Sequence, residues 1–173
     1  MAELNVMEQV SAKNIPDDPT GKYLTFSLGQ ELFGIEILKV QEIIGIMSTT
    51  KVPNTPDHMR GVINLRGKVI PVLELRLKLI MKPVPDTART CIIVVQVKGF
   101  DGPVTIGILV DAVSEVVQIA QSQIESAHGL GTQVNTSSLL GLGKAGGRVV
   151  ILLDVDKVLS LDEFEPPERP NQE

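Results

Sequence analysis

The chain repeats itself, and this internal repeat limits its fold more than any other feature. Three pairs of segments match in the same order along the chain: 23–28 with 92–97, 33–44 with 106–117, and 69–79 with 149–159. The offset between partners grows along the chain from 69 to 73 to 80 residues, as loop insertions in a second copy would produce. Three matches in one order indicate a duplicated unit.

The repeated segments have the period of β-strands. Leu24, Phe26 and Leu28 alternate with more polar neighbours, which is the two-residue period of a half-buried strand. The spacing of residues 38–46 would also suit a helix, but the segment is rich in β-branched side chains, so we predict a strand. Short helices are expected to close the two copies, around residues 75–81 and 154–160.

Each copy therefore supplies about five short strands, which can curl into a small barrel without exposed edges. A single copy of this length would bury only a thin core, so the two copies are expected to pack together. We predict an all-β fold with short helices, made of two pseudo-symmetric five-stranded barrels packed side by side with a groove between them.

The ends of the chain differ from its centre in composition. The start, which ends in PDDPTG, and the acidic, proline-rich end both read as solvated tails. We predict a flexible N-terminal tail at 1–21, a folded domain at 22–162 and an acidic Pro-rich tail at 163–173. The first copy spans about 22–85 and the second about 86–162, and the sequence leaves open whether they intertwine.

Composition excludes several classes of protein. One cysteine excludes an internal disulfide, and two histidines leave too few ligands for a zinc site, so no metal is expected. The chain has no apolar stretch of membrane-spanning length and no secretion signal at its start, which predicts a cytoplasmic protein without membrane insertion. The motif GLGKAG at 141–146 matches a dinucleotide pattern, but a strand-like segment follows it where that motif needs a helix. We therefore expect no cofactor.

Charge is unevenly distributed along the chain. Residues 51–82 carry seven basic side chains against two acidic ones, a net charge of +5, whereas the whole chain carries −5. No aromatic residue lies between Phe33 and Phe100, so a single-stranded nucleic acid would find no stacking surface there. A solvated face or a patch for an acidic protein partner is the better interpretation. A nucleic-acid-binding barrel and an enzyme with a polar pocket remain as alternative classes.

The segment RGVINLRGKVIPVLELR, at 60–76, combines a tight turn with clustered polar groups. Arg66 and Gly67 form the turn between two apolar strands, and Asn64 lies beside it. A guanidinium at such a tip is suited to a fork of hydrogen bonds with carboxylates or carbonyls. The residues alone leave two readings open: Arg66 is a solvated turn residue, or it grips a partner.

This segment closely resembles the hallmark of the CheW chemotaxis coupling-protein family. The segments FGIEILKVQEI and GILVDAVSEV, and GLGK followed by VVILLDVDKVL, resemble the same family, and the resemblance covers residues 22–160. It implies two barrels of the Src-homology-three-like type and no enzymatic activity. It also implies an adaptor that joins the cytoplasmic tip of methyl-accepting chemoreceptors to the regulatory domain of the CheA histidine kinase, in receptor arrays at the inner membrane.

The resemblance also implies which residues bind these partners. The positions that match the receptor-binding groove are Val40, Glu42, Gly61, Asn64, Leu65 and Arg66. The segment QIESAHGL at 123–130 matches a second region that links adaptor and kinase into rings. There, Leu130 replaces a residue that is often larger or aromatic in the family, and Glu125 replaces one that can be basic. The residues that contact the kinase elsewhere are not identified by the sequence.

Overall fold

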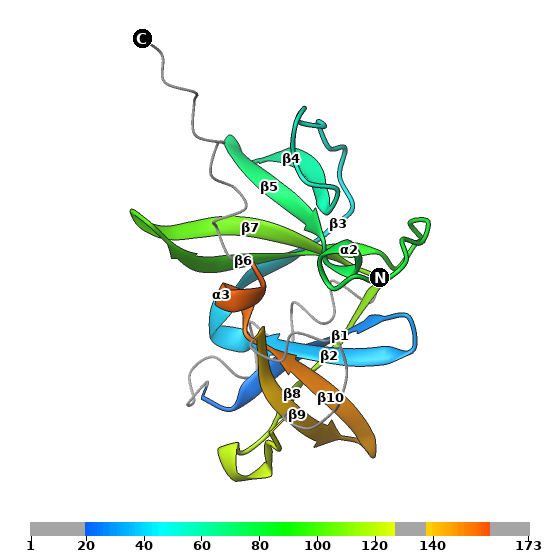
Figure 1. Cartoon of the computed structure of the whole chain (residues 1–173), viewed down its shortest axis with the longest axis vertical. Helices are drawn as coiled ribbons and strands as arrows, with labels where there is room; N and C mark the ends of the chain where they lie inside the picture. The colour runs from blue at the N-terminus through cyan, green and yellow to red at the C-terminus, as the bar shows by residue number, and fades with distance from the viewer. Residues whose placement is uncertain (1–19, 127–137, 160–173) are drawn as a thin grey trace.

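The strands form two five-stranded sheets, each curled into a small barrel. The computed structural model describes residues 20–126 and 138–159, and Figure 1 shows one barrel above the other. Barrel A contains β1 (Lys22–Leu28), β2 (Glu31–Glu36), β8 (Ala112–Gln118), β9 (Leu139–Ala145) and β10 (Arg148–Leu153). Barrel B contains β3 (Val40–Gly45), β4 (Met59–Leu65), β5 (Lys68–Glu74), β6 (Cys91–Gly99) and β7 (Gly102–Val110). The predicted fold class is confirmed.

The two barrels have the same strand order once the sequence copies are aligned. The order is β8-β1-β2-β10-β9 in barrel A and β3-β6-β7-β5-β4 in barrel B. The one parallel pairing falls at the same place in each, β2 with β10 and β5 with β7. Each barrel thus combines the first hairpin of one copy with three strands of the other. Neither of the copies predicted at 22–85 and 86–162 therefore holds all five strands of one barrel.

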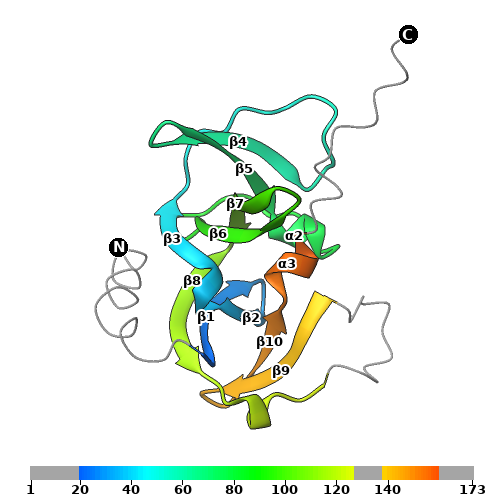
Figure 2. The same cartoon turned by 90° about the vertical axis from the view of Figure 1, so that its left-hand side faces the viewer.

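Short helical turns accompany the strands in the described part of the chain. They are η1 (Ile37–Lys39), α2 (Leu75–Lys78), η2 (Gln121–Gln123) and α3 (Val155–Val158). The chain crosses from barrel A to barrel B through η1. The strand predicted over 38–46 is wrong at its ends, because residues 38 and 39 belong to η1 and β3 spans Val40–Gly45. The chain crosses back at Asp111, between β7 and β8. In Figure 2, α2 and α3 lie at mid-height between the two barrels.

The largest group of buried side chains lies between the barrels. It draws residues from both sheets, among them Leu24, Phe26 and Ile35 of barrel A and Ile93, Val95 and Ile108 of barrel B. A smaller apolar cluster fills each barrel, around Leu152 in barrel A and around Val72 in barrel B. Because burial of apolar surface is the main stabilising contribution, each barrel depends on the other for most of its core.

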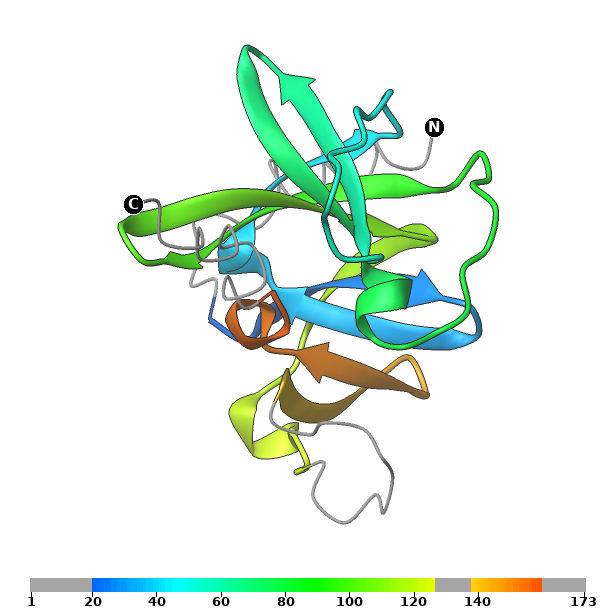
Figure 3. The ribbon, with the colours of Figure 1, turned by 45° about the horizontal axis from the view of Figure 1, so that its top comes forward.

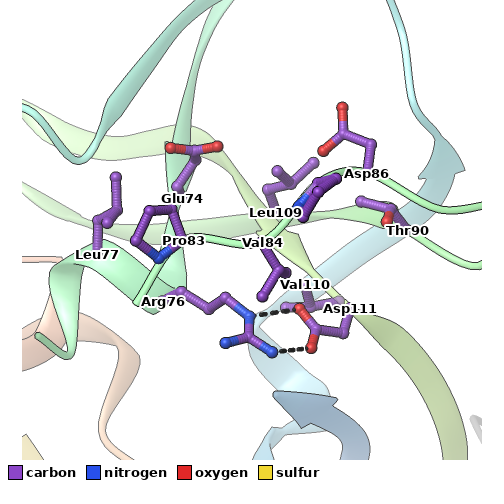
Figure 4. Close-up of a pocket in the computed structure, with 11 residues that line it drawn as sticks. Glu74, Arg76, Leu77, Pro83, Val84, Asp86, Thr90, Leu109, Val110 and Asp111 are labelled. Carbon is purple, nitrogen blue, oxygen red and sulfur yellow. Dashed lines mark hydrogen bonds and ion pairs between the residues drawn. The ribbon is translucent and has the colours of Figure 1, made fainter. Parts of the chain in front are cut away.

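Two hydrogen-bonded ion pairs fasten the barrels together at pseudo-equivalent places. In the first, the Arg76–Asp111 clasp, the guanidinium of α2 donates from Nε to Asp111 Oδ1 at 2.8 Å and from Nη2 to Asp111 Oδ2. The same carboxylate accepts a hydrogen bond of 2.8 Å from the backbone N–H of Gly29, in the β1–β2 turn. Figure 4 shows the fork between Arg76 and Asp111. This clasp therefore ties a helix of barrel B to a hairpin of barrel A.

The second, the Lys39–Asp156 clasp, has the opposite polarity. Here the helix supplies the acid: Asp156 of α3 accepts from Lys39 Nζ at 2.8 Å and from the Lys98 backbone N–H at 2.9 Å. Lys39 lies in the crossover η1 and Lys98 in β6, near the end of the β6–β7 hairpin. In Figure 3 this hairpin projects from the body of the molecule, with α3 in orange beneath it.

The interleaved strands predict that neither sequence copy folds alone. A fragment of residues 22–85 would hold two strands of barrel A and three of barrel B, so the core between the barrels could not form. Expressed separately, 22–85 and 86–162 should lack a cooperative thermal transition, which circular dichroism would show for residues 22–162. A cooperative transition in either fragment would contradict the dependence of each barrel on the other.

The clasps also predict how stability depends on pH. The hydrogen bond from Arg76 lowers the pKa of Asp111, and the Gly29 backbone adds to this effect. Burial on its own would raise the pKa of Asp156, but the hydrogen bonds from Lys39 and Lys98 and the charge of Lys39 outweigh it and lower the pKa. A carboxyl group whose pKa is lower in the folded than in the unfolded state stabilises the fold above its unfolded pKa. That contribution is lost as pH falls through the folded pKa.

We therefore expect the free energy of unfolding to fall as the pH drops below about 4. Replacing one clasp carboxylate, Asp111→Asn, should flatten this dependence, because the variant lacks the carboxyl that must be protonated. Urea denaturation at a series of pH values measures the effect. Asp101→Asn, at an exposed position of the β6–β7 turn, is the control and should leave the curve unchanged. Parallel curves for wild type and Asp111→Asn would contradict the expectation.

Candidate functional site

A two-pronged ion pair joins the two edge strands of barrel B. Arg66, in the β4–β5 turn, donates from Nη1 to Glu42 Oε1 at 2.5 Å and from Nη2 to Glu42 Oε2 at 2.7 Å. Glu42 lies in β3, which is at the other edge of the same sheet. The pair therefore bridges the open side of the barrel, and it brings together two of the predicted receptor-binding residues.

The two partners differ in exposure. The side chain of Glu42 is 18% exposed, whereas that of Arg66 is 71% exposed. The hydrogen bond from Arg66 lowers the pKa of Glu42, so this carboxylate stays ionised at neutral pH. Because a guanidinium has five N–H donors and Glu42 faces only its two terminal nitrogens, Arg66 keeps donors directed to solvent. Glu42 orients the guanidinium and leaves it able to bind a second acceptor.

The β4–β5 turn holds Arg66 in a left-handed backbone conformation. Arg66 and Gly67 both have positive φ angles, 51° and 85°, and Asn64 Oδ1 accepts a 2.9 Å hydrogen bond from the Gly67 N–H. The matching turn of barrel A places two glycines, Gly146 and Gly147, at these positions. A left-handed conformation is unfavourable for a residue with a Cβ. Barrel B thus carries a strained arginine where barrel A has no side chain.

Gly61 has a structural task in β4. Its φ is +150°, and a Cβ there would lie 2.5 Å from the backbone oxygen of Thr50. Thr50 and Val62 exchange two backbone hydrogen bonds of 2.9 Å, which extend the barrel beyond its named strands. Gly141 repeats this close approach in barrel A, against Glu125. The predicted receptor residue Gly61 therefore acts through the backbone.

The other two predicted receptor residues are partly buried. Val40, at the start of β3, packs against the core between the barrels, and Leu65 packs against the core inside barrel B. Neither is a fully exposed anchor. Of the six predicted residues, Glu42 and Arg66 are joined by hydrogen bonds, and Asn64 accepts from the Gly67 N–H within the same turn. Val40, Gly61 and Leu65 belong to the strands β3 and β4.

The second predicted region is only partly described. Glu125 is exposed, and its backbone exchanges two 2.8 Å hydrogen bonds with Leu142, which close barrel A as Thr50 and Val62 close barrel B. Leu130 lies outside the described residues. The ring contact assigned to these two residues stays a prediction.

A surface groove that the sequence did not indicate lies at the end of barrel B. One wall is formed by Glu36, Leu38 and Lys39, and the other by residues 96–99, 102 and 103 of the β6–β7 hairpin; its volume is about 580 Å³. We call it the hairpin groove. The side chain of Leu38 is 65% exposed. The sequence around Leu38 does not indicate this exposure, because a leucine in an apolar segment is equally compatible with a buried position in the core.

The arginines of the basic segment are paired with carboxylates in the folded chain. Arg60 bonds to Glu74 and Asp86, Arg66 to Glu42, and Arg76 to Asp111. Glu42, Asp86 and Asp111 come from outside the segment, so its excess charge is largely neutralised on folding. A pocket beside Arg76 and Asp86 (Figure 4) has a volume of about 20 Å³, roughly enough for one water molecule.

Other features of the described residues bear on chemistry. Within 20–126 and 138–159, no three His, Cys, Asp or Glu side chains are grouped as a metal site would require. In the same part of the chain, no helix is long and apolar enough to cross a bilayer.

Comparison with known proteins identifies the family. A family model for the CheW-like domain matches residues 22–163, which include both barrels. The chain belongs to the CheW family. A chemotaxis protein CheW of Klebsiella aerogenes is 38% identical over 164 residues, covering 95% of this chain and 94% of that protein. A probable chemotaxis protein CheW of Rhizobium etli is 34% identical over 142 residues, covering 82% and 89%.

A solved CheW structure shares the fold. The crystal structure of the scaffolding protein TtCheW from Thermoanaerobacter tengcongensis superposes with a TM-score of 0.73 at 32% identity, covering 83% of this chain and 94% of that one. The resemblance recognised in the sequence is thus confirmed. CheW proteins are non-enzymatic chemotaxis scaffolds, and this membership excludes the enzyme class that the sequence left open.

The site geometry predicts different roles for neighbouring residues. Gly61→Ala should lower the free energy of unfolding by about 1–3 kcal/mol, because it combines a positive φ with a clash against the Thr50 backbone. Arg66→Ala should change stability little, because its ion pair is exposed. Gly67→Ala is the control: its φ is also positive, but its Cβ would meet no atom within 4 Å. Equal losses for the two glycine variants in urea denaturation would show that the Thr50 contact is unimportant.

Proposed function

We propose that this protein is an adaptor that couples methyl-accepting chemoreceptors to a CheA-type histidine kinase. Membership of the CheW family over both barrels carries the proposal, together with two separate surfaces suited to protein partners. One surface is the Glu42–Arg66 pair with its turn, and the other is the hairpin groove. The adaptor acts in the cytoplasm and is recruited to receptor arrays at the inner membrane.

The receptor tip is the proposed occupant of the surface around Val40, Glu42, Gly61, Asn64, Leu65 and Arg66. An amphipathic helical hairpin buries apolar side chains in a groove and uses charges to fix its register. Val40 and Leu65 offer partly buried apolar surface, and Val69, 71% exposed beside Asn64 in the sheet, extends it. Arg66, already oriented by Glu42, supplies a directed donor for a carboxylate or a helix C-terminus of the receptor.

The kinase regulatory domain is the proposed occupant of the hairpin groove. The groove combines an exposed aliphatic side chain, Leu38, with strand backbone at the end of barrel B. Exposed apolar side chains in a concave surface are typical anchors of protein interfaces. Glu125, beside barrel A, and Leu130, outside the described residues, are the proposed second contact that links adaptor and kinase into rings.

Binding to a receptor-tip fragment tests the receptor surface. Val40→Arg should weaken binding by about 1–3 kcal/mol, because it removes apolar contact and places a charge where burial disfavours it. Arg66→Ala should also weaken binding, and Arg66→Lys should recover only part of the loss, because an ammonium cannot reproduce a planar fork. Isothermal titration of a chemoreceptor helical-hairpin fragment from the same organism measures both effects.

Lys144→Ala is the matched control for this titration. Lys144 is exposed and takes the position of Asn64 beside the equivalent turn of barrel A, so its loss should leave affinity unchanged. Melting temperatures measured in parallel separate lost contact from lost folding, which matters for Val40 because it also touches the core. Wild-type affinity in both Val40→Arg and Arg66→Ala would remove this surface from the receptor site.

A further inference from the structure

One carboxylate holds both walls of the hairpin groove. Asp156 Oδ2 accepts from Lys39 Nζ at 2.8 Å, on the η1 wall, and Asp156 Oδ1 accepts from the Lys98 backbone N–H at 2.9 Å, on the hairpin wall. We propose that Asp156 is a positioning residue that fixes the width of this groove and, through η1, its relation to the receptor-binding strand. The inference rests on the proposed two-partner function.

The connection to the receptor surface is short. The three residues of η1 end at Lys39, and β3 begins with the next residue, Val40, whose N–H donates to the Ile37 carbonyl oxygen. Leu38 and Lys39 line the hairpin groove, while Val40 and Glu42 belong to the proposed receptor surface. A shift of η1 would therefore alter both surfaces together.

The chemistry of position 156 fits this task. The aligned residue of the first copy is Arg76, which holds a single partner side chain, Asp111, in its clasp. A guanidinium has no acceptor, so an arginine at position 156 could not accept the Lys98 N–H. A carboxylate has two oxygens and can bind an ammonium and an N–H at once. The pair is largely shielded from water, because the side chains of Lys39 and Asp156 are only 26% and 21% exposed.

The Arg76–Asp111 clasp offers a matched comparison. It also joins the two barrels through one ion pair and one backbone N–H, that of Gly29. However, Arg76, Asp111 and Gly29 belong neither to the hairpin groove nor to the proposed receptor surface. Removing either clasp should weaken contact between the barrels in general. Only the removal of Asp156 should also affect the two proposed surfaces.

The test compares Asp156→Ala with Asp111→Ala in the full chain. Hydrogen exchange measured by mass spectrometry should show faster exchange in residues 37–42 and 96–99 for Asp156→Ala, and unchanged exchange there for Asp111→Ala. The exchange rates of Asp156→Asn should lie between those of wild type and Asp156→Ala, because the asparagine side-chain oxygen still accepts from Lys98.

Titrations measure the affinities for the receptor-tip fragment and for the kinase regulatory domain. Both affinities should fall about fivefold or more for Asp156→Ala. Both affinities should stay within about twofold of wild type for Asp111→Ala.

Three results would overturn the proposal: unchanged exchange in 37–42 for Asp156→Ala, equal effects of the two alanine variants, or loss of affinity at only one surface. If the wild-type protein binds neither fragment, the proposed function fails. The exchange comparison then decides by itself whether Asp156 holds the two walls of the groove.

Discussion

The apolar core between the barrels is the constraint on which the rest of the structure depends. Each barrel encloses only a small cluster of its own, around Leu152 or Val72, and turns an equally apolar outer face toward its neighbour. Because the chain crosses between the barrels twice, no cut through a single loop separates them into complete units. The clasps, the crossover η1 and both proposed surfaces keep their geometry because this shared core holds the barrels in one orientation.

Charged residues act mainly as connectors in this protein. The three arginines of the basic segment, the lysine of η1 and their carboxylate partners pair residues distant in sequence, such as Arg66 with Glu42 and Lys39 with Asp156. The exposed guanidinium of Arg66 contributes little to stability by its ion pair, whereas the two clasps are partly buried. Each of these pairs links a turn, a crossover or a helix to a distant part of the chain.

The sequence predicts the fold well because the signals for it are local or repeated. The alternation around Leu24 and Phe26 and the Arg66–Gly67 turn fall where a strand and a turn form. Of the strand predicted over 38–46, only Val40–Gly45 is a strand, because η1 takes up residues 38 and 39. The interleaving of copies could not be predicted, because strand order depends on whether η1 leads back to its own sheet or across to the other. For the site, the type of partner for Arg66 was predictable, but Glu42 as that partner was not. The hairpin groove could not be predicted either, because the exposure of Leu38 depends on the path of the chain through η1.

The crossing of the chain at η1 and at Asp111 has a consequence for how such a protein can arise. A single copy of the repeat would project its first hairpin away from its own three remaining strands, and it would be complete only by exchanging that hairpin with an identical molecule. The double barrel is therefore equivalent to a two-fold, domain-swapped homodimer fused into one polypeptide. Fusion frees the two halves to diverge. One half could then keep glycines at its turn while the other acquired Arg66, and the two clasps could take opposite polarity, which a symmetric homodimer does not permit.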